Sequence, residues 1–304
     1  MKSLIKIFAT ISLFFGVGTS ACSSIKPIQA AKLKVLAVET FLGDIAQNVA
    51  GDRMKVDILI PAGLDPHSFE PTPQDVARIA DSNLLIVNGF GLEEWLKSVL
   101  DNAGGSRLVI VATSGLAGRT PRPGEPVGVT DPHFWLDPTK VLTYVENIRA
   151  GLSQVDPDGA AIYGRNAAAY EAKLNDLDRW VKTQVSQIPP EKRLLVTNHE
   201  SFGYYADHYG FQIVGTIIPS VSPDASPSAQ QLSQLIDQIK KTGAPAIFLE
   251  TGSNPQLAQQ IAQETHVKVI TEFYTHSITA ASGPAPTYLD MIHFDTTVIV
   301  QALK

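Results

Sequence analysis

The sequence has a single cysteine, Cys22, among its 304 residues, so no disulfide can form within the chain. It also has no phosphate-binding glycine loop, no G-x-G-x-x-G fingerprint and no Ser-His-Asp context. The pair His199-Glu200 resembles the start of a zinc-protease helix, but position 203 is glycine, so the second histidine of H-E-x-x-H is missing. The missing second histidine argues against a metallohydrolase.

The chain also lacks an excess of basic residues and a long hydrophobic run. Its 24 lysines and arginines face 30 acidic residues, so we expect no nucleic-acid partner. An apolar fraction of 44% with 18% charged residues is typical of a globular protein. The length is too great for one ordinary core and suits two domains of roughly 120–150 residues.

The N-terminus reads as a secretory signal peptide over residues 1–21, because two lysines flank its start and a short apolar run leads to small residues. Cys22 follows those small residues as the modified cysteine of a lipoprotein does, with residues 22–32 as a tether. Ordinary cleavage after Ala21 or Ala30 is the alternative. We therefore predict an exported protein, in the periplasm or at the outer face of the cell membrane, with lipid anchorage through Cys22 left open.

From residue 33 onward, segments with strand character alternate with segments of helical periodicity. The predicted strands occupy residues 33–38, 56–60, 84–87, 108–111, 194–197, 211–214, 246–249 and 267–270. Such alternation favours parallel α/β sheets. We predict an N-terminal α/β lobe over residues 33–138 and a C-terminal α/β lobe over residues 189–304, each a mostly parallel sheet flanked by helices.

Between these lobes, residues 139–188 read as linking helices, the longest over residues 158–186. Its apolar and small residues recur every three or four positions: Tyr163, Ala167, Tyr170, Leu174, Leu177, Val181 and Val185. At 1.5 Å per residue it would be about 44 Å long. A coiled-coil dimer is one interpretation, but we favour a single helix that bridges the lobes of a monomer.

Four of the seven histidines occupy loops that follow predicted strands, namely His67, His133, His199 and His276. The first two share an Asp-Pro-His sequence, in which proline fixes φ and stiffens the turn. Ligands of open α/β sheets bind beyond the carboxyl ends of the strands. We therefore predict that these four histidines meet between the lobes and hold a metal ion. The other three, His208, His266 and His293, read as structural.

Three carboxylates accompany these histidines. Asp65 and Asp131 each precede a Pro-His pair and either accept from an imidazole N–H behind the metal or simply cap the turn. Glu250 ends a predicted strand on the ligand-facing side, where it could stand behind a histidine and supply charge.

Imidazole suits zinc better than calcium or magnesium, and manganese prefers oxygen donors with higher coordination numbers. Three or four neutral imidazoles make a good tetrahedral Zn²⁺ site. We predict zinc, with Mn²⁺ as the alternative. Because binding requires neutral imidazoles, the affinity should fall below about pH 6.5.

The chain resembles the metal-specific solute-binding proteins of bacterial ABC transporters, whose lobes are joined by one rigid helix. The motifs that carry the resemblance span most of the mature chain and occupy residues 63–73, 131–138, 197–205 and 288–292. The resemblance implies metal ligands at His67, His133 and His199, with a fourth in residues 274–278, where this chain has His276 and many relatives have aspartate. Relatives with histidine at the third ligand are assigned to zinc and those with glutamate to manganese.

The resemblance implies a protein that captures zinc between its lobes, delivers it to an ABC permease in the cytoplasmic membrane and catalyses nothing. The His- and acid-rich loop that many zinc-binding relatives insert before the second ligand is missing, since residues 115–130 contain no histidine. A manganese- or iron-binding protein of the same class remains an alternative. A surface adhesin or a zinc-dependent hydrolase is the alternative from another class.

Overall fold

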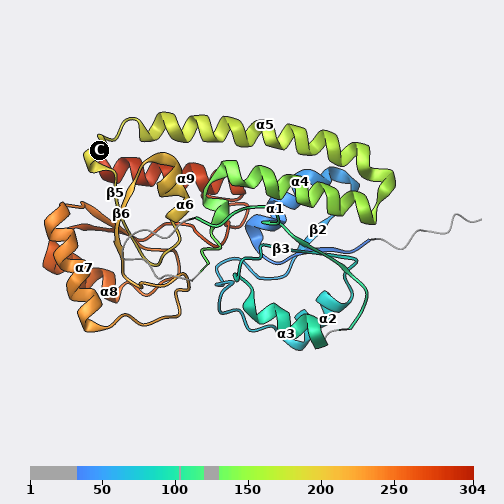
Figure 1. Cartoon of the computed structure of the whole chain (residues 1–304), viewed down its shortest axis with the longest axis horizontal. Coiled ribbons are helices and arrows are strands. Elements are labelled where there is room, and N and C mark those ends of the chain that lie inside the picture. Colours follow the sequence, from blue (N-terminus) through green and yellow to red (C-terminus); the bar gives the residue numbers. More distant parts are fainter. Residues whose placement is uncertain (1–32, 103, 120–129) are drawn as a thin grey trace, which may run out of the picture. The chain divides into compact units, whose positions relative to one another are not determined.

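The structure is a computed structural model that describes residues 33–102, 104–119 and 130–304 (Figure 1). The predicted signal peptide and tether, and most of the loop before His133, lie outside the described residues. The first half of the described chain forms a four-stranded sheet in the order β2-β1-β3-β4, with every pair parallel. Its strands are β1 (Val35–Ala37), β2 (Val56–Ile58), β3 (Leu84–Val87) and β4 (Leu108–Val111).

The second half repeats this topology. Its sheet has the order β6-β5-β7-β8, again with every pair parallel, although the register between β5 and β6 shifts after Leu195. Its strands are β5 (Leu194–Thr197), β6 (Gln212–Thr216), β7 (Ala246–Phe248) and β8 (Lys268–Ile270). The predicted α/β class, with two mostly parallel sheets, is confirmed.

Helices connect the strands, and several begin at side-chain caps. Thr72 and Ser228 each form a reciprocal capping box with the residue three positions on, and Thr287 accepts the backbone N–H of Asp290. The helices are α1 (Thr40–Ala50), α2 (Pro73–Ala80), α3 (Glu94–Asn102), α4 (Pro138–Val155), α5 (Ala160–Val185), α6 (Gly203–Tyr209), α7 (Ala229–Thr242), α8 (Gln256–Thr265) and α9 (Tyr288–Leu303). No helix in the described part of the chain has both the length and the hydrophobicity to cross a membrane.

The long helix α5 has 26 residues, about 39 Å at 1.5 Å per residue. It begins two positions later than predicted, because residues 157–159 close a 3-10 turn first, in which the N–H of Gly159 donates to the carbonyl of Asp156. All seven positions predicted to face the core are buried. The helix packs against α1 and α4 of the first half and α6 and α9 of the second (Figure 1), which confirms a bridge between the halves.

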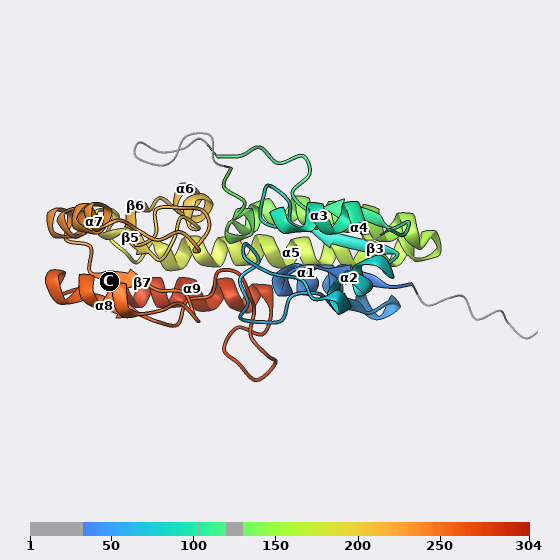
Figure 2. The same cartoon turned by 90° about the horizontal axis from the view of Figure 1, so that it is seen from below.

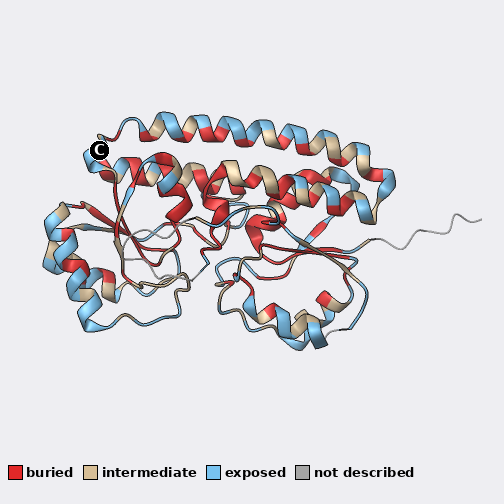
Figure 3. Ribbon diagram, in the orientation of Figure 1, coloured by how far each residue is buried: buried red, intermediate tan, exposed pale blue. Residues whose placement is uncertain are grey.

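Three apolar clusters account for the core. The largest lies beneath α5 and draws residues from both halves, among them the stacked pair Phe41 and Trp135 with ring centroids 4.4 Å apart. Each sheet has a smaller cluster of its own on the opposite face, under α2 and α3 in the first half and under α7 and α8 in the second (Figure 2). Figure 3 shows that buried and exposed residues alternate along α5, so that its inner face is buried and its outer face is exposed. The halves therefore share one core.

Candidate metal centre

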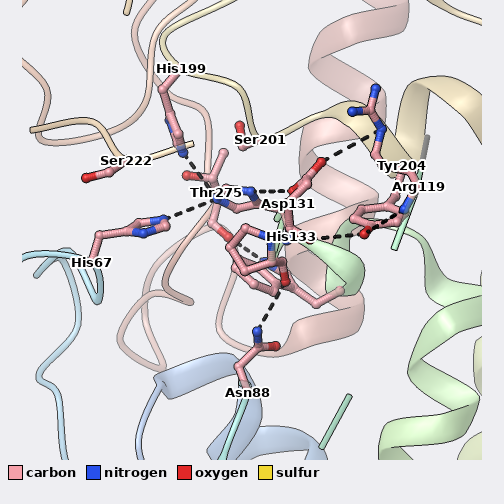
Figure 4. Close-up of polar contacts among 12 residues, drawn as sticks. His67, Asn88, Arg119, Asp131, His133, His199, Ser201, Tyr204, Ser222 and Thr275 are labelled. Carbon is pink, nitrogen blue, oxygen red and sulfur yellow. Dashed lines mark hydrogen bonds and ion pairs between the residues drawn. The ribbon is translucent and has the colours of Figure 1, made fainter. Parts of the chain in front are cut away.

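The four predicted histidines meet at one point between the halves. Figure 4 shows three of them, His67, His133 and His199. His67 lies in the loop after β2, and His133 precedes the 3-10 turn Phe134–Leu136 that leads into α4. His199 follows β5 by two residues, and His276 lies in the loop after β8. Sequences up to 209 residues apart thus contribute to one cluster, because the carboxyl ends of both parallel sheets face it.

The ring nitrogens converge around His133. Its Nε2 lies 3.4 Å from Nε2 of His67 and 3.2 Å from Nε2 of both His199 and His276. One nitrogen from each of the four rings can be chosen so that all lie within 4.8 Å of one another. A tetrahedron with Zn–N bonds of 2.0–2.1 Å has edges of about 3.3–3.4 Å. The three contacts of His133 have that length, so these nitrogens could hold one small cation.

Asp131 fixes the orientation of His133. Its Oδ1 accepts the backbone N–H of His133 at 3.0 Å and lies 2.8 Å from the ring Nδ1. With the proton of the neutral ring on Nδ1, the lone pair of Nε2 is left free to point at the other three rings. Asp131 therefore caps the turn and also stands behind the imidazole, the two roles left open from the sequence.

Contacts from both halves hold Asp131 in place. The hydroxyl of Tyr204 in α6 donates to the carbonyl of Asp131 at 3.0 Å, and Nε of Arg119 lies 3.8 Å from its carboxylate. Gly203 permits this approach, because a Cβ there would lie 2.7 Å from Oδ2 of Asp131 and 2.5 Å from Nε of Arg119. The position of His133 thus depends on contacts with both halves.

Glu250 stands behind His199 in the second half. Its Oε1 lies 2.6 Å from Nδ1 of His199, in an ion-pair contact. The hydroxyl of Ser201 reaches the same oxygen at 3.5 Å. Both His199 and Glu250 are buried. The structure therefore places Glu250 next to a site histidine, at the strand end where the sequence suggested it.

His67 and His276 are held through their loops instead. Asp65 accepts the backbone N–H of His67 at 3.0 Å and makes no ring contact within hydrogen-bonding distance, so it caps its turn. Nδ1 of His276 lies 3.2 Å from the hydroxyl of Thr275, whose carbonyl accepts from the indole N–H of Trp135 at 2.7 Å. Each half thus pairs one imidazole backed by a carboxylate with one on a more open loop.

Burial and mutual repulsion keep three of the rings neutral. Burial, with the charge of His199, lowers the pKa of His67 to about 3. Burial and the neighbouring histidines likewise hold the pKa of His133 and of His276 far below its usual range. His199 differs: burial, the largest single influence, would lower its pKa, but Glu250 together with Asp65 and Asp131 outweighs burial, so the pKa is raised. Only one of the four rings therefore favours a proton.

A cavity of about 440 Å³ opens beside His276. It is lined by the loops 62–68, 250–253 and 273–279, with Pro223 and Asp224 at one side. Three carboxylates face it: Asp65, Asp224 and Glu250. This cavity gives solvent and cations a route to the ring of His276.

The three histidines predicted to be structural lie elsewhere. His208 is half-buried rather than on the surface of its helix, because its Nε2 lies 2.7 Å from Asp178 of α5. His266 ends α8 with a positive φ of 58°, and the ring of His293 packs edge-on against Trp180. Trp135, Thr275 and Tyr204 also support the site, although none was predicted from the sequence. Trp135 and Tyr204 lie within the motifs at residues 131–138 and 197–205, and Thr275 directly precedes His276, which are the signals that could have suggested them.

Comparison with known proteins gives consistent results. The family model described as zinc-uptake complex component A, periplasmic, matches residues 35–302. A manganese-binding lipoprotein of Halalkalibacterium halodurans is 35% identical over 90% of this chain and 89% of its own length. An iron-binding protein of Yersinia pestis is 32% identical over 97% of this chain and 94% of its own.

Solved structures show the same fold. A manganese-bound periplasmic metal-binding protein from Candidatus Liberibacter asiaticus superposes with a TM-score of 0.81 and 33% identity, over 90% of this chain and all of the other. A periplasmic zinc-binding protein of Treponema pallidum gives a TM-score of 0.82 with 25% identity, over 90% and 99% of the two chains. The names of these relatives cover three different metals.

Proposed function

This chain belongs to the periplasmic zinc-uptake component A family, and from that premise we propose that it captures Zn²⁺ through His67, His133, His199 and His276. Proteins of this family are solute-binding components of metal ABC transporters and are not enzymes. The chain accordingly works outside the cytoplasm, binds a metal ion and serves a membrane permease. The expectation from the sequence motifs, a metal-specific solute-binding protein, is confirmed.

The observation that carries the zinc proposal is the convergence of four imidazole nitrogens with carboxylates only behind them. Asp131 and Glu250 contact the outer nitrogens of His133 and His199, so neither is directed at the centre. Four imidazole donors, with the three nitrogen–nitrogen distances from His133 between 3.2 and 3.4 Å, suit tetrahedral zinc once His199 has lost its proton. The two carboxylates also balance the charge of the ion from one bond further out.

Manganese, or iron, is the second candidate, because the relatives at 35% and 32% identity are named for these metals. Manganese favours oxygen ligands. To supply one, Glu250 would have to turn away from His199 and towards the centre. We favour zinc because both carboxylates already contact imidazoles.

A competition experiment separates the two metals. The mature protein is refolded without metal, offered equal concentrations of zinc and manganese, and analysed for bound metal. We expect zinc to be retained. Retention of manganese instead would overturn the assignment.

The variant His276→Asp sharpens this result. It replaces one nitrogen donor by an oxygen donor at the loop next to the cavity. We expect the bound fraction of manganese to rise relative to the native protein. No change in preference would indicate that His276 lies outside the ligand set.

For attachment to the membrane we propose lipidation of Cys22, which lies outside the described residues. The sequence supports this with a signal-like segment that ends in small residues just before Cys22. In cells, Cys22→Ser should move the protein from the membrane fraction to the soluble extracytoplasmic fraction. Unchanged partitioning would favour ordinary cleavage.

A further inference from the structure

Two glutamates are buried together beside the first sheet, and the metal site does not use them. Glu39 follows β1 and is 1% exposed, and Glu93 precedes α3 and is 7% exposed. The two carboxyl groups interact with each other, and both oxygens of Glu39 are buried. No lysine or arginine in the described part of the chain forms an ion pair with either of them, and the phenol of Tyr144 in α4 lies within range of both charges.

The two carboxyl groups have different surroundings. Glu93 accepts two backbone N–H bonds, from Asn88 at 2.5 Å and from Gly89 at 2.9 Å, which stabilise its anionic form. Neither oxygen of Glu39 accepts a hydrogen bond from any other described residue. A buried carboxylate without donors is costly, and two adjacent carboxylates also repel each other. One proton on Glu39 removes both penalties, because the acid can then donate to Glu93.

Asn88 connects this pair to the metal site. Its side-chain amide donates at 3.1 Å to the carbonyl of Pro132, the residue before His133 (Figure 4). Its own carbonyl accepts from the hydroxyl of Thr113 at 2.6 Å, and its amide oxygen accepts from the hydroxyl of Tyr144. Asn88 is fully buried. The turn that Glu93 stabilises thus holds the loop that carries His133.

We propose that Glu39 and Glu93 share a single proton at neutral pH, and that the pair positions His133 through Asn88. The positioning role rests on the proposed ligand function of His133. The shared proton is independent of that proposed function, because it is a property of the metal-free protein. Loss of the proton leaves two facing carboxylates, whose repulsion separates the end of β1 from the turn after β3.

The shared proton makes stability depend on pH. Burial and then the charge of Glu93 raise the pKa of Glu39, so the folded protein keeps a proton that the unfolded chain releases above about pH 4.3. Stability attributable to this group is therefore present at low pH and lost as pH rises towards the folded pKa. Glu39→Gln removes the titration, because its amide donates to Glu93 at any pH.

The first experiment measures the thermal unfolding midpoint of metal-free protein between pH 5.5 and pH 8.5. We expect Glu39→Gln to have a flatter pH dependence than the native protein and a midpoint at least about 3 °C higher at pH 8.5. Glu94→Gln, at an exposed neighbouring carboxylate, should keep the native dependence. A lower midpoint for Glu39→Gln with the native slope overturns the shared proton. The shared proton is also overturned if sodium or potassium raises the midpoint of the native protein but not that of Glu39→Gln, because the pair would then hold a cation instead of a proton.

Two further measurements test the proton and the positioning role separately. Infrared spectra at pH 7 should show a carbonyl band of neutral carboxylic acid that is weaker in Glu39→Gln than in the native protein, because the buried Asp295, whose pKa is raised by burial, still contributes to it. Bands of equal intensity in both proteins overturn the proton. Glu93→Gln should weaken zinc binding several-fold in competition with a chelator, while Glu94→Gln should not. Native zinc affinity in folded Glu93→Gln overturns the positioning role alone.

Discussion

At equivalent positions, the two sheets carry different side chains. In the first sheet, Ala37 and Ile86 form the last opposed pair of β1 and β3. Two residues further along each chain segment come Glu39 and Asn88. In the second sheet, Thr197 and Phe248 lie opposite each other at the ends of β5 and β7. Two residues further along come His199 and Glu250. The strand order is the same, and the pairing of the two central strands in each sheet ends on an opposed pair, so the backbone offers the same place in both halves.

The halves use that place differently. In the second half, the central strands present an imidazole with a carboxylate behind it. In the first half they present an acid and an amide, and the histidines come instead from loops after the edge strands β2 and β4. The central strands of the first half therefore act on the metal site indirectly, through Asn88 and the loop before His133. The shared topology therefore places a residue at the same position in both halves. Only in the second half is that residue a histidine that can bind the metal.

The largest expected effect comes from removing single ligands in each half. Alanine at His133 or at His199 should each weaken zinc binding by about 3 kcal/mol, more than a hundredfold, since a structural zinc site of four ligands is worth about 10–16 kcal/mol. Chelator competition measures the loss. His266→Asn, at a histidine that only ends α8, should bind as the native protein does. If one of the two variants lost most of its zinc affinity and the other lost none, the two halves would not contribute equally as ligand donors.

The carboxylates behind the two buried imidazoles should differ in their effect on protons. Both Asp131→Asn and Glu250→Gln should weaken zinc binding by about 10–100-fold. Only His199 has a raised pKa, so zinc must displace about one proton near neutral pH, and the affinity should fall about tenfold per pH unit below that pKa. His67, His133 and His276 stay neutral over the same range because their pKa values are lowered.

Calorimetry in buffers with different ionisation enthalpies measures these protons. Without the charge of Glu250, burial lowers the pKa of His199, so proton release near pH 6.5 should disappear in Glu250→Gln. It should persist in Asp131→Asn. Equal proton release from both variants would mean that the two carboxylates act alike.

A smaller effect should follow from crowding the contact between α6 and Asp131. Gly203→Ala places a Cβ 2.7 Å from Asp131 and should destabilise the metal-free protein by about 1–3 kcal/mol while lowering zinc affinity several-fold. Gly164→Ala in α5 meets no atom within 4 Å and should stabilise by about 0.5–1 kcal/mol. Denaturant unfolding measures both. An unaffected zinc affinity in Gly203→Ala would show that the first half positions His133 without help from the second.

Local sequence signals predicted the elements well. The strands and the buried face of α5 followed from short-range periodicity. Four histidines could be singled out because each follows a strand, and parallel strands direct their carboxyl ends to one side. The sequence could also name Glu250, although the strength of its contact with His199 depends on a pairing across β5 and β7.

Other features depend on contacts between distant segments and left no local trace. The buried pair Glu39 and Glu93 reads in sequence as two ordinary acidic residues near helix starts. The link from Asn88 to Pro132 joins residues 44 positions apart. The close approach that requires Gly203 depends on Asp131 and Arg119 lying against α6. Such features follow from the packing of the two halves, which no single segment encodes.

The core shared by the two halves bears on how fast metal can exchange. Separating the halves would expose apolar surface of that shared cluster, at about 25 cal/mol for each Å². The loop 62–68 lines the cavity and contributes no residue to the cluster, whereas the loop 273–279 contributes Phe273 and Ile278. Loop motions occur in nanoseconds to microseconds and collective domain motions in microseconds to milliseconds. We therefore expect the residence time of the ion to be set by breaking the bond to His67 on the loop 62–68 first, with the rest of the protein acting as a fixed frame.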